Sequence, residues 1–183
     1  MTHRQHGRVS RPTTLDELEG HVPTTFIEGA KAASDAFRSQ GIKHVLIGGL
    51  AVGINGYPRP TRDIDFLVDD NAFEFHGPIV THRPGLPISY KGIGIDWVSL
   101  EPNERSALAE FMILPFPNDV PVMPVEPLIA MKLLVGRQKD RSDIVEMIKA
   151  GVDIQSCLAF AERAFPKTVT LLTRLIKQAE IEQ

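Results

Sequence analysis

The sequence predicts an α+β protein in which a mixed β-sheet with flanking helices precedes a C-terminal helical subdomain. Short apolar, strand-like runs alternate with helix-like segments up to about residue 126, whereas only helical periodicity follows. The composition, with 43% hydrophobic and 23% charged residues, is that of an ordinary globular protein. We therefore expect a disordered basic arm over 1–12, an α/β core over 13–126 and a helical subdomain over 127–183.

Charge and cysteine content exclude several classes of protein. The 20 Lys and Arg residues against 23 Asp and Glu give a formal net charge of −3, which argues against coating nucleic acid by bulk charge. A single cysteine, Cys157, excludes an internal disulfide framework and a multi-cysteine zinc site. The chain has no apolar run near the roughly 18 residues of a membrane span, and its polar N-terminus does not resemble a secretory signal. We expect a cytoplasmic protein with no membrane contact.

The first half of the chain carries helix and strand signals in alternation. Thr25 and Glu28 form a capping box, and Gly41 supplies a C-terminal stop. Period-2 alternation and apolar runs indicate the strands. The predicted elements, in chain order, are a helix over 25–40, a strand over 44–47, a glycine turn with a short helix over 50–55, and a strand over 63–68.

Prolines and glycines divide the rest of the chain. Gly136, Gly151 and Pro166 separate the helical segments of the second half. The remaining predicted elements are a short helix over 69–76, a loop over 78–87, strands over 88–90 and 93–100, a helix over 101–111, extended pieces over 113–125, and helices over 128–135, 142–150, 154–165 and 167–181.

Three carboxylates on two predicted strands form the most informative pattern. Asp63 and Asp65 lie two residues apart on one strand, so both side chains leave the same face. Two neighbouring carboxylates repel each other and are costly to desolvate, which favours a bound cation. Asp96 interrupts the apolar run of a later strand and reaches the same cluster if the two strands pair. Hard oxygen ligands of this kind suit Mg²⁺ or Mn²⁺.

A glycine pair lies fourteen positions before the paired acids. Gly48 and Gly49 follow a predicted buried strand and precede a helix, a position where backbone N–H groups can bind phosphate. A plain tight turn is the alternative. The dinucleotide fingerprint fails because Leu50 stands where its second glycine should be, and the Walker loop fails because no Lys-Ser/Thr follows Gly53.

The glycine pair, the short helix and the run from Arg59 through Thr61 to the paired acids together resemble the signature of the DNA polymerase β-like nucleotidyltransferases. The sequence is most similar to small bacterial members that include the AbiEii-type toxins, over roughly residues 43–148. The resemblance implies that Asp63 and Asp65 bind metal ions and that a third acid, Asp96, completes the site. It also implies that the two glycines hold the phosphates of a nucleoside triphosphate (NTP).

The second half adds a less specific resemblance. In those toxins a lysine contacts the triphosphate and an aspartate follows near the next helix, and the matching positions are Lys132 with Asp140 or Asp143. A surface lysine on an amphipathic helix and a helix-start charge are the alternatives. Further basic residues near Lys132 favour a triphosphate or RNA groove, or a solvated helix end; they are Arg137, Lys139 and Arg141. Arg59 and Arg62 flank the paired acids, where one of them is expected to neutralise the site or contact a phosphate, and a surface role is the alternative.

The resemblance implies a metal-dependent transfer of a nucleoside monophosphate from an NTP, such as ATP, to a hydroxyl, with release of pyrophosphate. An RNA 3′ end, for example of tRNA, is the favoured acceptor, and a protein hydroxyl or a small molecule is also open. A toxin of this family would have a partner antitoxin. One alternative is a non-catalytic module that binds nucleotide or RNA. Another is a nucleotidyltransferase whose acceptor is a small, aminoglycoside-like molecule.

Overall fold

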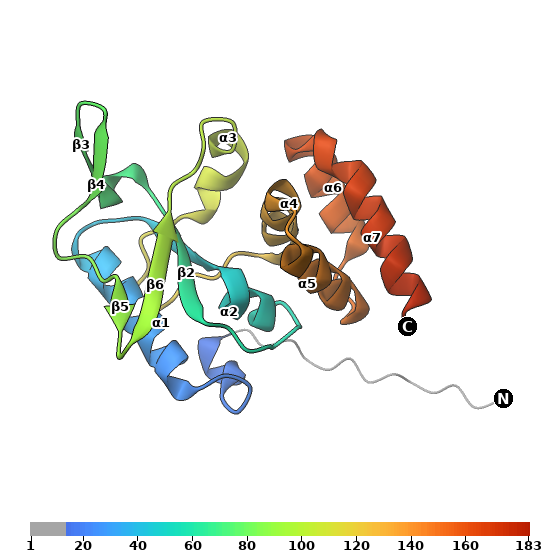
Figure 1. The fold of residues 1–183 in the computed structure, drawn as a ribbon, viewed down its shortest axis with the longest axis horizontal. Coiled ribbons are helices and arrows are strands. Elements are labelled where there is room, and N and C mark those ends of the chain that lie inside the picture. Colours follow the sequence, from blue (N-terminus) through green and yellow to red (C-terminus); the bar gives the residue numbers. More distant parts are fainter. Residues whose placement is uncertain (1–13) are drawn as a thin grey trace.

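A four-stranded sheet lies at the centre of the computed structural model, which describes residues 14–183 (Figure 1). The predicted arm over 1–12 lies outside the described residues. The strands are β1 (His44–Ile47), β2 (Asp63–Val68), β5 (Ser89–Tyr90) and β6 (Ile93–Val98), in the order β1-β2-β6-β5. The pair β2–β6 is parallel and the other two pairs are antiparallel, so the sheet is mixed. The predicted α+β class with a mixed sheet is confirmed.

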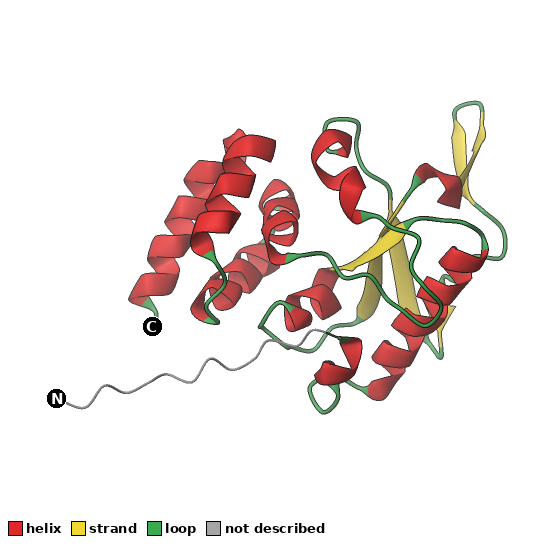
Figure 2. Ribbon diagram, turned by 180° about the vertical axis from the view of Figure 1, so that it is seen from behind, coloured by secondary structure: helices red, strands yellow, loops and turns green. Residues whose placement is uncertain are grey.

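The two faces of the sheet are covered by different helices because side chains alternate along each strand. Phe66 of β2 and Trp97 of β6 face α1 (Thr24–Ser39), where Phe37 lies 5.4 and 5.9 Å from their ring centroids. Leu67, one residue along β2, instead joins the core formed with the C-terminal helices. Figure 2 shows these helices grouped on the side of the sheet away from α1. They are α4 (Val125–Val135), α5 (Gln138–Lys149), α6 (Ile154–Ala164) and α7 (Val169–Ile181).

The N-terminal half of the prediction is mostly confirmed, with two corrections. Helix α1 begins at Thr24 after Pro23, and the structure shows no side-chain cap at this start, so the capping box is wrong. Glu28 accepts a hydrogen bond from Lys91 at 2.8 Å instead, because a tertiary partner lies within its reach. The glycine pair lies inside α2 (Gly48–Ile54) rather than in a turn before it.

The segment after β2 differs from the prediction. Only Asp70–Ala72 is helical, as one 3₁₀ turn, and residues 73–76 form β3 (Phe73–His76) instead of a helix. The expected loop over 78–87 contains β4 (Ile79–His82), which pairs with β3 as a separate antiparallel ribbon. The ribbon is held at its base, where the rings of Phe73 and Trp97 lie 5.3 Å apart. Phe73 and Trp97 are far apart in the sequence, and their packing stabilises a strand where the local sequence pattern favours a helix.

The remaining elements follow the prediction closely. The expected helix over 101–111 is α3 (Arg105–Leu108) followed by a 3₁₀ turn. Extended pieces of the proline-rich segment cover the outer edge of β1, where Ile113 bridges His44 and Val122 bridges Leu46. The four C-terminal helices form as expected, but α4 and α5 begin three and four residues earlier than predicted. Within residues 14–183, no helix is both long and apolar enough to cross a membrane.

Candidate functional site

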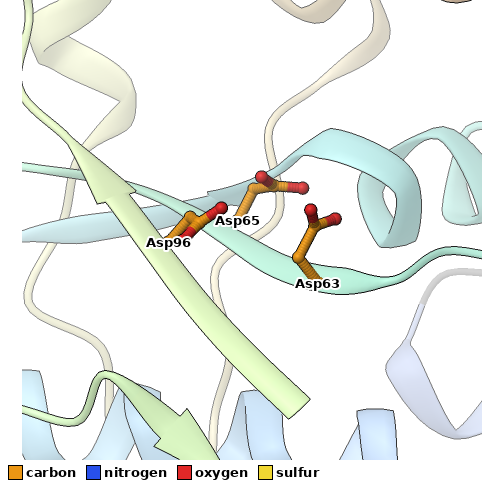
Figure 3. Close-up of side chains that lie close together, drawn as sticks. All are labelled: Asp63, Asp65 and Asp96. Carbon is orange, nitrogen blue, oxygen red and sulfur yellow. The ribbon is translucent and has the colours of Figure 1, made fainter.

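The strand register brings the three predicted carboxylates together. In the parallel pair β2–β6, Asp65 lies directly opposite Asp96, and Asp63 lies two residues before Asp65 on the same face. One carboxylate oxygen from each of the three lies within 4.8 Å of the others. Figure 3 shows the three side chains leaving the two strands on one side. The expected pairing of the third acid with the first two is therefore confirmed as geometry.

The electrostatics of this cluster favour a bound cation. Burial and the nearby charges of Asp63 and Asp96 raise the pKa of Asp65 to about 6, although a hydrogen bond from the Gly49 N–H opposes the shift. A carboxylate in this setting is destabilised in its charged form, and a divalent ion would remove that cost. Three hard oxygen donors within a few ångströms suit Mg²⁺ or Mn²⁺. The donor set therefore fits the metal that the resemblance implies.

The two glycines allow α2 to approach β2 closely. Gly48 has a φ of +66°, and a Cβ there would overlap the Asp65 carboxylate. A Cβ on Gly49 would lie 2.6 Å from the Thr61 hydroxyl oxygen. The N–H of Gly49 donates to Asp65. The sequence predicted that this amide would be available for phosphate, but in the structure it is engaged by the acid cluster. The glycine pair thus allows the close packing of α2 against the acid cluster.

A pocket of about 170 Å³ opens beside the acids and joins residues from both halves of the chain. Asp63 and Asp65 lie on its sheet side, whereas most of its basic side chains come from the C-terminal helices and the turn between them. Its apolar lining comes mainly from one face of α4. The basic lining residues are Arg59, Lys132, Arg137 and Lys139, and the apolar ones are Ile47, Leu128, Met131 and Val135.

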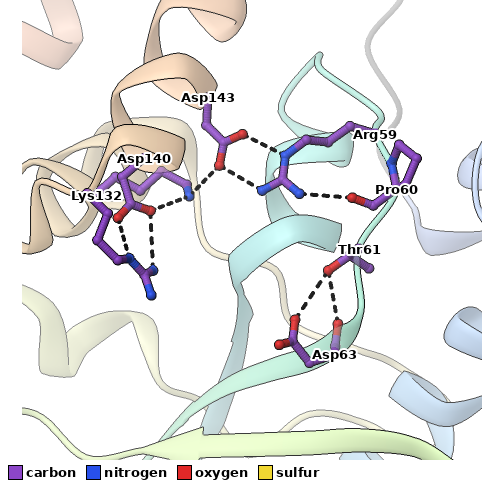
Figure 4. Close-up of polar contacts among 8 residues, drawn as sticks. Arg59, Pro60, Thr61, Asp63, Lys132, Asp140 and Asp143 are labelled. Carbon is purple, nitrogen blue, oxygen red and sulfur yellow. Dashed lines mark hydrogen bonds and ion pairs between the residues drawn. The ribbon is translucent and has the colours of Figure 1, made fainter.

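Two buried carboxylates, Asp140 in the pocket lining and Asp143 behind it, bind three of these cations (Figure 4). Asp143 on α5 accepts two hydrogen bonds from Arg59, at 2.6 and 2.7 Å, and one from the Lys132 ammonium at 2.7 Å. Asp140 accepts from Lys132 at 3.1 Å and from Arg137 at 2.8 Å. We call these five residues the ion-pair network.

The ion-pair network keeps its acids charged despite burial. Burial alone would raise the pKa of Asp143, but hydrogen bonds from Arg59 and Lys132 outweigh it and lower the pKa. The pKa of Asp140 is lowered in the same way, chiefly by Arg137 and Lys132. The side chains of Asp143 and Lys132 are only 1% and 9% exposed. Lys132 is therefore not the surface lysine of the alternative interpretation, and Asp143 is more than a helix-start charge.

Most of the predicted site residues meet at this pocket. Asp96 adjoins it through the acid cluster and Asp143 lies behind it, whereas Arg62 is exposed and outside the lining. The predicted residues that line it are Gly48, Gly49, Arg59, Asp63, Asp65, Lys132, Arg137 and Asp140.

The sequence pattern assigned no role to two features. Thr61, identified from the sequence only as part of the signature, supports the site, since its hydroxyl donates to the Asp63 carbonyl at 3.2 Å. The apolar lining was also missed, although its signal was present: Leu128, Met131 and Val135 share the spacing of one helix face with Lys132.

Comparisons with known proteins add little to this geometry. No protein-family model and no curated protein sequence matches the chain. One solved structure that is similar is described as an antigenic nucleotidyltransferase-like protein from Paracoccidioides brasiliensis. It has 17% sequence identity and a TM-score of 0.39, over 88% of this chain and 94% of that chain. The function proposed next therefore rests on the site residues themselves.

Proposed function

We propose that the protein is a metal-dependent nucleotidyltransferase. The observation that carries the proposal is the meeting of opposite charges in one pocket: Asp63 and Asp65 lie on the sheet side, and most of the cations lie on the helical side. An NTP bound to divalent ions has matching parts, because the ions need hard oxygen ligands and the phosphates need positive charge. A pocket for a simple anion would not need three neighbouring carboxylates beside it, which repel an anion unless a cation is bound.

In this proposal each half of the chain supplies one part of the site. Residues 13–126 form the nucleotidyltransferase core, and residues 127–183 form the helical subdomain that contributes Lys132 and its acids. Asp63, Asp65 and Asp96 would hold Mg²⁺ or Mn²⁺, which supplies charge neutralisation and a more acidic acceptor hydroxyl when bound. Gly48 and Gly49 line the pocket beside the acids, where the phosphates of the NTP would lie.

The reaction is an in-line displacement at the α-phosphorus of the NTP. The acceptor hydroxyl oxygen forms a bond to that phosphorus, the bond to the β-phosphate bridging oxygen breaks, and pyrophosphate leaves. Asp96 is the exposed member of the cluster, and in this proposal its carboxylate would take the proton of the acceptor hydroxyl. Lys132, with Arg137 and Lys139 nearby, would stabilise the charge that develops on the leaving pyrophosphate.

The acceptor and the biological role follow from the family resemblance. We propose an RNA 3′ end, such as that of tRNA, as the acceptor, and a protein hydroxyl or a small aminoglycoside-like molecule as the competing acceptor classes. We also propose a toxin role under the control of a partner antitoxin. Expression of the wild type would then arrest growth, and Asp63→Ala would abolish the arrest; growth unaffected by the wild type would refute the toxin role.

Calorimetric binding of the four NTPs, with and without Mg²⁺, tests the proposed activity. We expect Mg²⁺-dependent binding that is lost in Asp63→Ala/Asp65→Ala. The matched control is Asp16→Ala/Asp70→Ala, which removes two exposed carboxylates that form surface ion pairs elsewhere. Transfer of α-phosphate label to RNA, protein or small-molecule acceptors would then identify the acceptor class. Binding without transfer to any acceptor would instead support a non-catalytic nucleotide-binding module.

A further inference from the structure

The side chain of Arg59 connects the two sides of the pocket. Arg59 belongs to the segment that leads into β2 and its two acids, whereas its partner Asp143 belongs to α5. Nε and Nη2 donate to the two oxygens of Asp143, and Nη1 donates to the Pro60 carbonyl at 3.0 Å. Such bidentate pairing fixes the orientation of both groups as well as their distance. The Arg59 side chain is only 13% exposed.

Asp143 passes this constraint on to Lys132. The Lys132 ammonium donates to the same Asp143 oxygen that accepts from Arg59 Nη2. Neither Asp143 nor Lys132 is solvated, so the direction of the ammonium is set by its carboxylate partners rather than by water. A displacement of Asp143 would therefore move the Lys132 charge at the wall of the pocket.

Arg59 also decides the net charge of the ion-pair network. The network contains three cations, Arg59, Lys132 and Arg137, and two carboxylates, Asp140 and Asp143. It therefore carries one surplus positive charge. Without Arg59 the remaining two cations and two carboxylates would cancel, and the network would no longer add positive charge to that of Lys139 at the pocket.

We propose that Arg59 is a positioning residue that orients Lys132 through Asp143 and provides the surplus positive charge, rather than a direct phosphate ligand. This revises the sequence-based expectation that Arg59 binds the nucleotide. It rests on the proposed function only in that the natural polyphosphate would be the NTP. Inorganic tripolyphosphate tests it independently, because this ion contains the phosphate chain without the nucleoside.

The test is calorimetric titration of tripolyphosphate, in the presence of Mg²⁺, into a set of matched variants. Arg59→Gln should weaken binding about tenfold or more, since it removes a buried charge. Arg59→Lys retains the charge but not the bidentate geometry, so we expect an intermediate loss of about threefold to tenfold. Arg59→Gln/Asp143→Asn removes both members of the pair and restores one surplus positive charge, but not the orientation of Lys132, so it should recover binding to the level of Arg59→Lys.

Controls separate this role from folding and from catalysis. Arg105→Gln breaks an exposed arginine–aspartate pair, in which Nη1 and Nη2 contact the two oxygens of Asp70, and should leave tripolyphosphate binding unchanged. Mn²⁺ binding at the acid cluster, followed by electron paramagnetic resonance, should be the same in every Arg59 variant. Loss of Mn²⁺ binding in Arg59→Gln would show a general folding role and overturn the proposal.

The double variant gives the decisive outcome. If Arg59 contacts the phosphates directly, Arg59→Gln/Asp143→Asn will bind as weakly as Arg59→Gln, which would overturn the proposal. A wild type that does not bind tripolyphosphate, or an Arg59→Gln variant that binds it normally, would overturn it as well. If the variants bind tripolyphosphate as expected but the wild type transfers no nucleotide to any acceptor, the role of Arg59 is supported and the proposed enzymatic activity is refuted.

Discussion

The substitution Asp65→Asn in metal-free protein tests the strain within the acid cluster. The native carboxyl has a pKa of about 6 against an ordinary value of 3.8, because it is partly buried and faces Asp63 and Asp96. A shift of roughly two pH units corresponds to about 3 kcal/mol of destabilisation of the ionised form. Asparagine has nearly the same shape, carries no charge and can still accept a hydrogen bond from the Gly49 N–H.

The sign of this effect depends on pH. Below about pH 4 the carboxyl is protonated in both the folded and unfolded chain, so wild type and Asp65→Asn should differ little. Between about pH 4 and pH 6 the unfolded carboxyl ionises before the native one, so the contribution of Asp65 to stability falls as pH rises. Above pH 6 the destabilisation is complete, and the variant should be more stable by up to about 3 kcal/mol.

Thermal and urea unfolding with a chelator present, from pH 4 to pH 8, measure this difference. For a chain of this size, 3 kcal/mol corresponds to an increase in Tm of about 6–12 °C. Asp70→Asn, in an exposed surface pair, is the control and should change stability by less than about 0.5 kcal/mol. A variant that is no more stable than the wild type at pH 7.5, or equally stabilised at pH 4, would refute the electrostatic reasoning.

The remaining predictions concern the metal, the glycine pair and the buried lysine. Mn²⁺ at about 100 times its Kd should stabilise the wild type by about 2.7 kcal/mol but not Asp63→Ala/Asp65→Ala; equal shifts in scanning fluorimetry would contradict a site at these acids. Gly48→Ala should cost at least about 1–3 kcal/mol in urea unfolding, because alanine is strained at positive φ and its Cβ overlaps the Asp65 carboxylate; unchanged stability would contradict that close approach. Lys132→Met leaves two buried carboxylates short of a cation and should lower the free energy of unfolding by about 3–5 kcal/mol. The control Lys31→Met, in a surface pair, should lower it by less than about 1 kcal/mol. Similar losses in the two variants would show that Lys132 is effectively solvated.

Some features of the fold could be predicted because they are local. The strands β2 and β6, the four C-terminal helices and the placement of Asp63 and Asp65 on one face follow from periodicity within a single segment. The β3–β4 ribbon could not be predicted in this way. It is held by packing of Phe73 against Trp97, which lies 24 residues further along the chain.

The candidate site likewise has features that are local in the sequence and features that depend on tertiary packing. The sequence by itself determined which acids, glycines and basic residues are present and on which face of each element they lie. The tertiary structure alone decided that Asp96 lies opposite Asp65 and that Arg59 reaches Lys132 through Asp143. The physical reason is that side-chain alternation is a property of one backbone segment, whereas strand register and buried ion pairs depend on how distant segments pack together.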